Sequence, residues 1–285
     1  MKAYKSFAVV GAGTIGLPII GALAAQNVSI VLLSRPGSPP KTVPSGVKVI
    51  QVDYNDATAV AAVLTRHRVD VVLSTVNIAG LGSQTALVDA TKLSGAQLFV
   101  PSEYATPTDH QPPGTDNPLG GTGTKNRIAE YARSVGVPSL RVFTGPFTEG
   151  IPWLLGLAEH GKIIAVGKGE APVSFTAVPD IAGFVAYVLT SLPPSELQDR
   201  IFRLEGERTS LNDLGLQLGT AVEHVDRIEG DESKTGLLKL LDSGAGSTGW
   251  DEAHKREGSG SHAAGSANGL WPGHSWKSIK EVLQL

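Results

Sequence analysis

Short apolar runs alternate with amphipathic stretches through the first half of the chain. The apolar runs at 6–10, 28–33, 47–52, 69–74, 96–100 and 139–143 predict buried strands. Between them, the segments 14–26, 57–67, 81–93 and 125–135 have the spacing of helices. This alternation predicts an α/β fold, a Rossmann-type doubly wound parallel sheet. The prolines of 36–46 (PGSPPKTVPSG) forbid a helix between the second and third strands.

The pattern changes after Gly145. We expect a short helix at 151–159, strands at 163–166 and 173–176, and a helix at 180–189 with Asp180 as its N-cap. Residues 229–270 are rich in Gly, Ser and charge and are interpreted as a long loop. The segment 271–285 is expected to form a closing helix anchored by Trp271 and Trp276. The predicted division is a Rossmann domain at 1–149 and a smaller C-terminal α+β region at 150–285, from which 178–192 can return to the first domain.

Composition narrows the class of protein. The 285 residues are 41% hydrophobic and 18% charged, as in a packed globular chain. A formal net charge of −3 gives no general attraction to nucleic acid or to an anionic membrane. The absence of cysteine excludes disulfides and thiolate chemistry. Residues 6–34 carry no charge, but glycines and a proline interrupt them and no signal-peptide layout is evident. We expect a cytoplasmic protein without a membrane span.

The sequence VVGAGTIG places Gly11, Gly13 and Gly16 in G-x-G-x-x-G spacing, between a predicted strand and a predicted helix, with Thr14 and Ile15 inside the motif. The first glycine allows a tight turn, the second lets the backbone approach a pyrophosphate, and the third packs helix on strand. The pyrophosphate then lies at the positive end of the helix. Because the motif opens a series of βαβ units, it predicts dinucleotide binding.

The end of the second predicted strand indicates which dinucleotide. NAD sites carry an acidic residue about 20 residues after the motif, yet no Asp or Glu precedes Asp53 here. Ser34 and Arg35 stand there instead, followed by Lys41, and such groups suit a 2′-phosphate. NADP(H) is therefore the predicted cofactor, although Arg35 could also be a solvated loop cation.

Two further segments are predicted to line the cofactor. Asp53 is placed to meet the adenine, or else it caps the helix that starts near Asp56. The backbone from Ser74 to Val76, at the end of the fourth strand, would line the cofactor as well.

Lys125 stands where a helix is predicted to begin. Short-chain dehydrogenases pair a tyrosine and a lysine as Y-x-x-x-K, but Gly121 occupies the tyrosine position here. The chain resembles the isoflavone reductase-like group within the NmrA-like family of atypical short-chain dehydrogenases. The likeness rests on GAGTIG at 11–16, FVPSEYA at 99–105, KNRIAEYARSVGVPSLRVFTGPF at 125–147, GKGEAPVSFTAVPDIAGFV at 167–185 and the closing tryptophan-containing segment.

That resemblance implies NADPH binding, a lone lysine as acid/base group at Lys125, and an aromatic ring on the nicotinamide at Phe147. The chemistry is compatible with this role. A free lysine titrates near about 10.4, and burial, a helix N-terminus and an oxidised nicotinamide would all lower the pKa of Lys125. Lys125 could also hold the nicotinamide ribose, and the plainer alternative is a surface lysine whose stem lies along the helix.

The substrate is less constrained. Tyr104 and Trp153 are candidate pocket walls, although ordinary core packing explains them equally, and His110 is a candidate proton donor that could be merely solvated. Glu103 is expected to fix its loop. The leading hypothesis is an NADPH-dependent reductase of a small aromatic or conjugated carbonyl or ether-type substrate. The alternative is a non-catalytic NADP-binding redox sensor of the NmrA type. No metal, nucleic-acid or membrane partner is expected, and a homo-oligomer stays open.

Overall fold

The computed structural model describes residues 3–109, 111 and 122–284. The chain forms two compact units. The N-terminal unit comprises 1–102, 124–141 and 182–201, and the C-terminal unit comprises 103–123, 142–181 and 202–285. Each unit is therefore assembled from separate stretches of sequence. The predicted functional division at 149/150 stays a prediction.

A five-stranded parallel sheet forms the centre of the N-terminal unit, in the order β3-β2-β1-β4-β5. Its strands are β1 (Ser6–Val10), β2 (Ser29–Ser34), β3 (Lys48–Gln51), β4 (Val71–Ser74) and β5 (Leu98–Val100). Every residue of β1 is buried, as expected for the central strand of a sheet covered on both faces. A parallel bridge from Phe99 to Ser139 leads on to β6 (Leu140–Phe143), which pairs with β9 (Arg200–Arg203).

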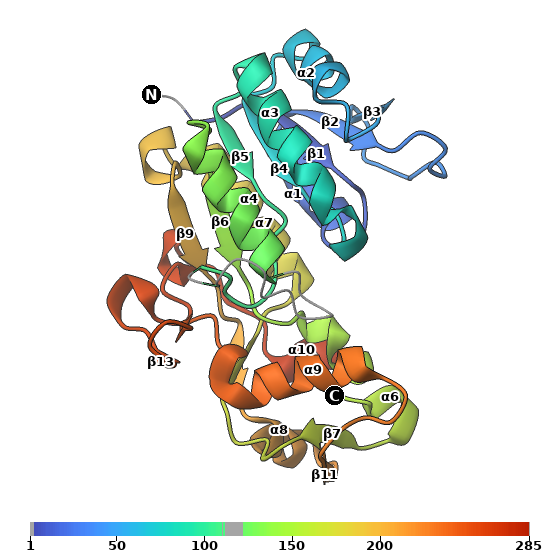
Figure 1. The fold of residues 1–285 in the computed structure, drawn as a ribbon, viewed down its shortest axis with the longest axis vertical. Coiled ribbons are helices and arrows are strands. Elements are labelled where there is room, and N and C mark those ends of the chain that lie inside the picture. The colour runs from blue at the N-terminus through green and yellow to red at the C-terminus, as the bar shows by residue number, and fades with distance from the viewer. Residues whose placement is uncertain (1–2, 110, 112–121, 285) are drawn as a thin grey trace. The chain divides into compact units, whose positions relative to one another are not determined.

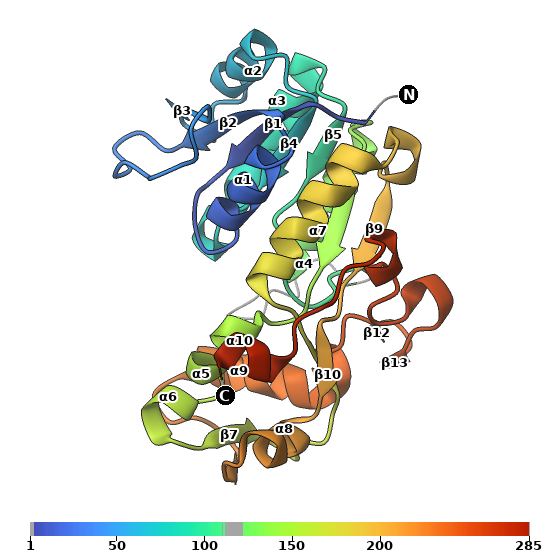
Figure 2. The same cartoon turned by 180° about the vertical axis from the view of Figure 1, so that it is seen from behind.

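Helices cover both faces of this sheet. Figure 1 shows α2 (Ala57–Arg66), α3 (Gln84–Ser94) and α4 (Thr122–Ser134) on one face. Figure 2, from behind, shows α1 (Gly16–Ala24) and α7 (Val178–Ser191) on the other face. The predicted α/β class and doubly wound sheet are thus confirmed. The strand order is the one in which dinucleotides bind at the carboxyl ends of the strands.

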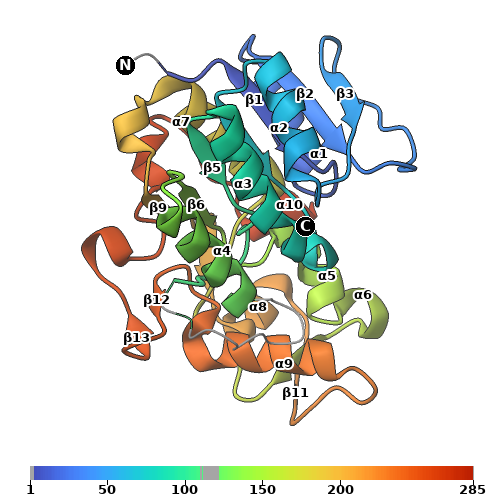
Figure 3. The ribbon, with the colours of Figure 1, turned by 45° about the horizontal axis from the view of Figure 1, so that its top comes forward.

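The connection from β2 to β3 contains no helix, as the prolines predicted. It loops away from the sheet beside β3 at the sheet's edge (Figure 3). A second departure from a plain Rossmann repeat follows β4, where a 3₁₀ segment, η1 (Ile78–Ser83), runs directly into α3. Both irregular segments lie next to strand carboxyl ends, where a ligand would bind.

The C-terminal unit has small strand pairs packed with short helices. β7 (Ile163–Val166) pairs in parallel with β11 (Val222–Val225), and β8 (Val173–Phe175) pairs antiparallel with β10 (Glu207–Thr209). Its core includes Phe175, Leu214 and Leu238. The other elements of the C-terminal unit are η2 (Thr148–Gly150), α5 (Ile151–Leu154), α6 (Leu157–His160), α8 (Leu211–Leu218), α9 (Glu232–Leu240), η4 (Leu241–Ala245), β12 (Trp250–Asp251), β13 (Arg256–Glu257), η5 (Gly260–His262), η6 (Asn268–Leu270) and α10 (Ile279–Leu283). A short segment of the N-terminal unit, η3 (Pro194–Glu196), follows α7.

Three local predictions for this region are wrong. The predicted loop at 229–270 contains α9, because Asp231 caps that helix and Leu238 buries its apolar face. The helix expected at 151–159 is broken at Gly156, which has φ +75°. Asp180 lies inside the first turn of α7 and does not cap it, since α7 begins at Val178.

The closing helix expected over 271–285 is wrong for most of its length, because α10 is the one helix of this segment that the structure describes and it begins only at Ile279. Trp271 stacks on His274 with ring centres 3.6 Å apart, and Trp276 meets both rings edge-on. Asp180 accepts a hydrogen bond from the backbone N–H of Lys277 at 2.8 Å. The two tryptophans thus pack as a half-buried aromatic cluster within this segment.

Candidate functional site: a dinucleotide cavity

The glycine turn joins β1 to α1 by a conformation that side chains disfavour. Gly11 has φ +96°, and an added Cβ would lie 3.3 Å from the carbonyl oxygen of Thr75. The Thr75 hydroxyl lies 3.0 Å from the carbonyl oxygens of both Val10 and Gly11, to which it donates. The end of β4 therefore holds the turn in place from one side.

The other two glycines of the motif differ in their surroundings. A Cβ on Gly16 would lie 2.6 Å from the Gly11 carbonyl oxygen and 2.5 Å from the Thr75 hydroxyl oxygen. A Cβ on Gly13 would meet nothing within 4 Å, and Gly13 lines a cavity. The third glycine thus permits close packing of helix on turn, and the second leaves open space that a phosphate can approach.

This contrast predicts opposite outcomes for two matched variants. Gly16→Ala is expected to lower the free energy of unfolding by about 1–3 kcal/mol, because the methyl group overlaps backbone that cannot move freely. Gly13→Ala is expected to leave the unfolding free energy nearly unchanged while weakening NADPH binding. Urea denaturation and nucleotide titration of both variants would test this. Equal destabilisation by the two substitutions would contradict the assigned roles.

A cavity of about 510 Å³ lies at the carboxyl ends of β1, β2 and β4. A volume of this size is within the range of cofactor sites. Its lining comprises Gly11, Ala12, Gly13, Ser34, Arg35, Ser38, Pro39, Lys41, Asp53, Tyr54, Asn55, Thr75, Val76, Asn77, Ala79, Gly80, Gly82 and Ser83. Seven predicted cofactor residues are therefore brought together here: Gly11, Gly13, Ser34, Arg35, Lys41, Asp53 and Val76. Thr14, Ile15, Gly16 and Ser74 are not in this lining.

The end of β2 gives the cavity its basic side. Arg35 and Lys41 are exposed, and neither forms an ion pair with any residue that the structure describes. Asp53 is the single acidic residue of the described lining. Two cations without carboxylate partners, together with the hydroxyls of Ser34 and Ser38, offer the donors that a 2′-phosphate requires.

The sequence left open whether Asp53 caps a helix or faces the cofactor. In the structure, Asp56 caps the helix and Asp53 lines the cavity. Asp56 caps α2, accepting a hydrogen bond from the Ala59 backbone N–H at 2.8 Å. Asp53 instead accepts from the backbone and side chain of Asn55, at 3.0 and 3.1 Å. The capping alternative therefore falls to Asp56, and Asp53 faces the cavity.

Replacing the cap should be measurable in stability. Asp56→Ala is expected to cost about 1 kcal/mol of unfolding free energy through loss of the helix cap. Asp53→Ala is the matched control and should cost less, because the hydrogen bonds of Asp53 are exposed and cap no helix. Thermal denaturation of both variants would test this, and a larger loss of stability in Asp53→Ala than in Asp56→Ala would contradict Asp56 as the cap of α2.

Sequence reasoning missed part of the lining. The Tyr54 hydroxyl donates to the Leu33 carbonyl at 2.7 Å, and burial raises the pKa of Tyr54 to about 12, against the opposing charge of Arg35. Tyr54 therefore stays neutral and fixes the end of β2. Residues 77–83 were missed because the helix was expected from Leu81. The paired glycines at 80 and 82 were the available signal of an irregular turn.

Lys125 lies in the first turn of α4 and is only 9% exposed. It belongs to the N-terminal unit with the cavity but is not part of the cavity lining. Lys125 is therefore a buried lysine at the beginning of a helix. The alternative, a surface lysine whose stem lies along the helix, does not apply because the side chain is buried.

The predicted residues on the substrate side belong to the C-terminal unit. Phe147 is half-buried and forms a parallel bridge with Thr176. Tyr104 is 8% exposed, its hydroxyl has no hydrogen-bond partner among the described residues, and burial raises the pKa of that phenol. Glu103 accepts a hydrogen bond from the Thr108 hydroxyl at 2.8 Å, which fixes the loop. Trp153 is 63% exposed. His110 lies outside the described residues.

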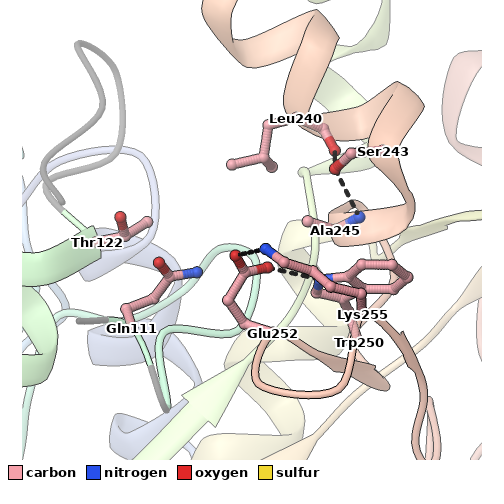
Figure 4. Close-up of a pocket in the computed structure, with 8 residues that line it drawn as sticks. All are labelled: Gln111, Thr122, Leu240, Ser243, Ala245, Trp250, Glu252 and Lys255. Carbon is pink, nitrogen blue, oxygen red and sulfur yellow. Dashed lines mark hydrogen bonds and ion pairs between the residues drawn. The ribbon is translucent and has the colours of Figure 1, made fainter.

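A second cavity, of about 540 Å³, lies in the C-terminal unit (Figure 4). Glu252 accepts a hydrogen bond from the Trp250 indole N–H at 2.8 Å and forms an ion pair with Lys255. Because Glu252 and Lys255 neutralise each other's charge, this cavity is expected to attract a charged ligand only weakly. Within the described residues, no cluster of side chains could hold a metal ion, and no helix is long and apolar enough to cross a membrane.

Known proteins of similar sequence and structure fit this architecture. "Oxidoreductase BOA1" of Botryotinia fuckeliana is 28% identical over 220 residues, covering 72% of this chain and 71% of that protein. The complex of leucoanthocyanidin reductase with NADPH from Vitis vinifera matches with a TM-score of 0.76 at 19% identity, over 98% of each chain. An isoflavone reductase structure matches with the same TM-score at 17% identity, again over 98% of each chain.

These two structural likenesses show the fold. The sequence also shows the family, because the model of the "NmrA-like family" matches residues 4–216 of the 285. The predicted resemblance is confirmed: the chain belongs to the NmrA-like family.

Proposed function

We propose that the protein is an NADPH-dependent reductase of a small aromatic or conjugated carbonyl or ether-type substrate, with Lys125 as its acid/base group. The observation that carries the proposal is the cavity at the strand ends. It combines the open space beside Gly13 with two cations that lack carboxylate partners among the described residues, Arg35 and Lys41. A relative that covers most of the chain bears the name oxidoreductase, which supports redox chemistry.

The residues fit NADPH at both of its charged ends. The turn from Gly11 to Gly16 would offer backbone N–H groups and the start of α1 to the pyrophosphate. Arg35, Lys41 and the Ser34 hydroxyl would hold the 2′-phosphate, which an NAD-type carboxylate would repel. Asp53 would face the adenine. When bound, NADPH supplies a hydride to the substrate.

The hydride goes to a carbon atom of the substrate. The protein must then deliver a proton to the atom where negative charge develops, which is the oxygen of a carbonyl or ether, or the α-carbon of a conjugated carbonyl. Lys125 is the group proposed for this step, since its ammonium can donate a proton and its burial limits exchange with water. Phe147 is proposed to lie against the nicotinamide ring. Tyr104 stays protonated because burial raises its pKa, and it is proposed as a wall of the substrate pocket.

Two measurements test the proposal. Titration by nicotinamide fluorescence should give tighter binding of NADPH than of NADH to the wild-type protein. A screen with NADPH against conjugated ketones, quinones and aryl ethers should then reveal turnover. Equal affinity for the two nucleotides would refute the cofactor assignment. Tight NADPH binding without turnover across the screen would favour the alternative, a non-catalytic redox-sensing regulator.

A further inference from the structure

Lys234 is a buried cation in the C-terminal unit. It lies in the first turn of α9 and is 7% exposed. Its backbone N–H donates to the Asp231 side chain at 2.8 Å, but its ammonium has no carboxylate partner among the residues that the structure describes. Lysines buried to this degree are almost always paired with an acid, because an unpaired buried charge is costly. An anion bound from solution would therefore stabilise the Lys234 ammonium, since no described residue supplies a carboxylate.

An aromatic ring lies close to this ammonium. The Lys234 ammonium nitrogen lies 5.5 Å from the centre of the Trp153 ring, within the range of a cation–π contact. Trp153 itself is 63% exposed, an uncommon position for so large an apolar side chain. The two residues thus combine a cation, held in place by burial, with an aromatic surface that is accessible to a flat ring.

Lys234 also lines a cavity of about 400 Å³ that lies wholly within the C-terminal unit. Lys234 is part of the cavity lining and keeps a small exposed fraction. Ile164, Val225 and Ile228 give the cavity an apolar surface. A cavity of this volume accommodates a small aromatic compound.

The acidic residues around this cavity have other partners. Glu159 lies 3.7 Å from His160, and Glu229 forms an ion pair with Arg227 at 3.6 Å. Asp231 is engaged as the cap of α9. Both glutamates are more than 70% exposed at the side chain, so solvent screens their charge from a bound anion. The buried Lys234 ammonium is therefore the charged group most able to attract a ligand here.

We propose that this site binds an aromatic compound bearing a carboxylate. Lys234 pairs with the carboxylate, and the exposed ring of Trp153 contacts the aromatic ring. The inference is independent of the proposed reductase activity, because the cavity lies wholly within the C-terminal unit. It adds to the protein a binding site for an aromatic carboxylate, with Lys234 as the residue that selects the acidic group.

Calorimetric titration of the full chain with trans-cinnamate and with its neutral amide, cinnamamide, tests this directly. Cinnamate is expected to bind the wild type about tenfold or more tightly than cinnamamide, the worth of one charge-assisted hydrogen bond. Lys234→Met should remove that difference, while Lys234→Arg should retain most of it. Trp153→Ala should weaken the binding of both compounds.

Lys239→Met is the matched control, because Lys239 is an exposed lysine on the same helix and outside the cavity lining. It should bind cinnamate as the wild type does. Thermal denaturation of each variant would establish that it folds, and Lys234→Arg keeps the test informative if Lys234→Met is unstable. Absence of cinnamate binding, equal affinity for the acid and the amide, or full affinity in a folded Lys234→Met would each overturn the proposal.

The result of the cinnamate titration can be distinguished from the result of the reductase test. Cinnamate binding needs no nucleotide, and NADPH affinity is expected to be unchanged in Lys234→Met. Lys234-dependent cinnamate binding would support the proposed site whether or not the protein oxidises NADPH. Turnover of NADPH in the screen, together with absence of cinnamate binding, would support the reductase and overturn the proposed site.

Discussion

Replacing Lys125 with methionine is expected to lower kcat by roughly 10²–10⁴-fold, the usual worth of general acid/base catalysis. Methionine keeps an unbranched apolar stem of similar length in a position that is only 9% exposed, so the packing of the first turn of α4 is largely retained. The substitution removes the ammonium. NADPH affinity should change far less, because the glycine turn and Arg35 are untouched. Steady-state kinetics on a substrate identified by the screen, with a separate nucleotide titration, would measure both quantities.

Lys92→Met is the matched control for this experiment. Lys92 is an exposed lysine in the last turn of α3, in the same unit but outside the cavity lining. Its replacement should leave both kcat and NADPH affinity near wild-type values. Normal turnover by Lys125→Met would refute the acid/base role. Loss of NADPH binding in that variant would assign Lys125 to holding the cofactor and would strengthen the regulator hypothesis.

Arg35→Ala is expected to weaken NADPH binding by about 1.5–3 kcal/mol for each charge-assisted hydrogen bond that Arg35 donates to the 2′-phosphate. Arg35 lines the cavity, is exposed, and forms no ion pair with the described residues, so its removal leaves no buried acid without a partner there. NADH, which lacks the 2′-phosphate, should bind nearly as before. The variant therefore changes the preference between the two nucleotides more than it changes binding in general, and parallel fluorescence titrations would show this.

Arg66→Ala removes the same charge from the last turn of α2, away from the cavity lining. It should affect neither nucleotide. An equal loss of NADPH and NADH affinity in Arg35→Ala would point to a general effect on the fold of the loop. Raising the salt concentration should narrow the NADPH preference of the wild type, because the exposed Arg35 and Lys41 are screened by ions.

The N-terminal unit could be predicted almost wholly from the sequence. Its strands are short, buried apolar runs such as Ser6–Val10, and local chemistry, the prolines of 36–46 and the glycines of 11–16, marks the turns. Both signals act over a few residues, so no knowledge of distant contacts is needed. Seven of the cavity residues could be predicted for the same reason, since the carboxyl ends of parallel strands lie at one edge of the sheet.

The C-terminal unit could not be predicted as well, because its order depends on contacts between distant residues. α9 lies in a segment rich in glycine and charge, but Leu238 and Leu241 pack into a core with Val173 and Phe175. Asp180 looked like a helix cap, yet it accepts a hydrogen bond from a segment far along the chain, at Lys277. The approach of Lys234 to Trp153 has no local signal at all.

The division of the N-terminal unit among 1–102, 124–141 and 182–201 has a consequence for synthesis on the ribosome. The five strands of the sheet are complete in the nascent chain by Val100, but α7, which covers one face, is still to be made. At about 5–20 residues per second, the 99 residues from 103 to 201 take about 5–20 s to translate. During that interval apolar sheet surface is exposed in the cell, and chaperones that hold such surfaces are expected to bind the nascent chain.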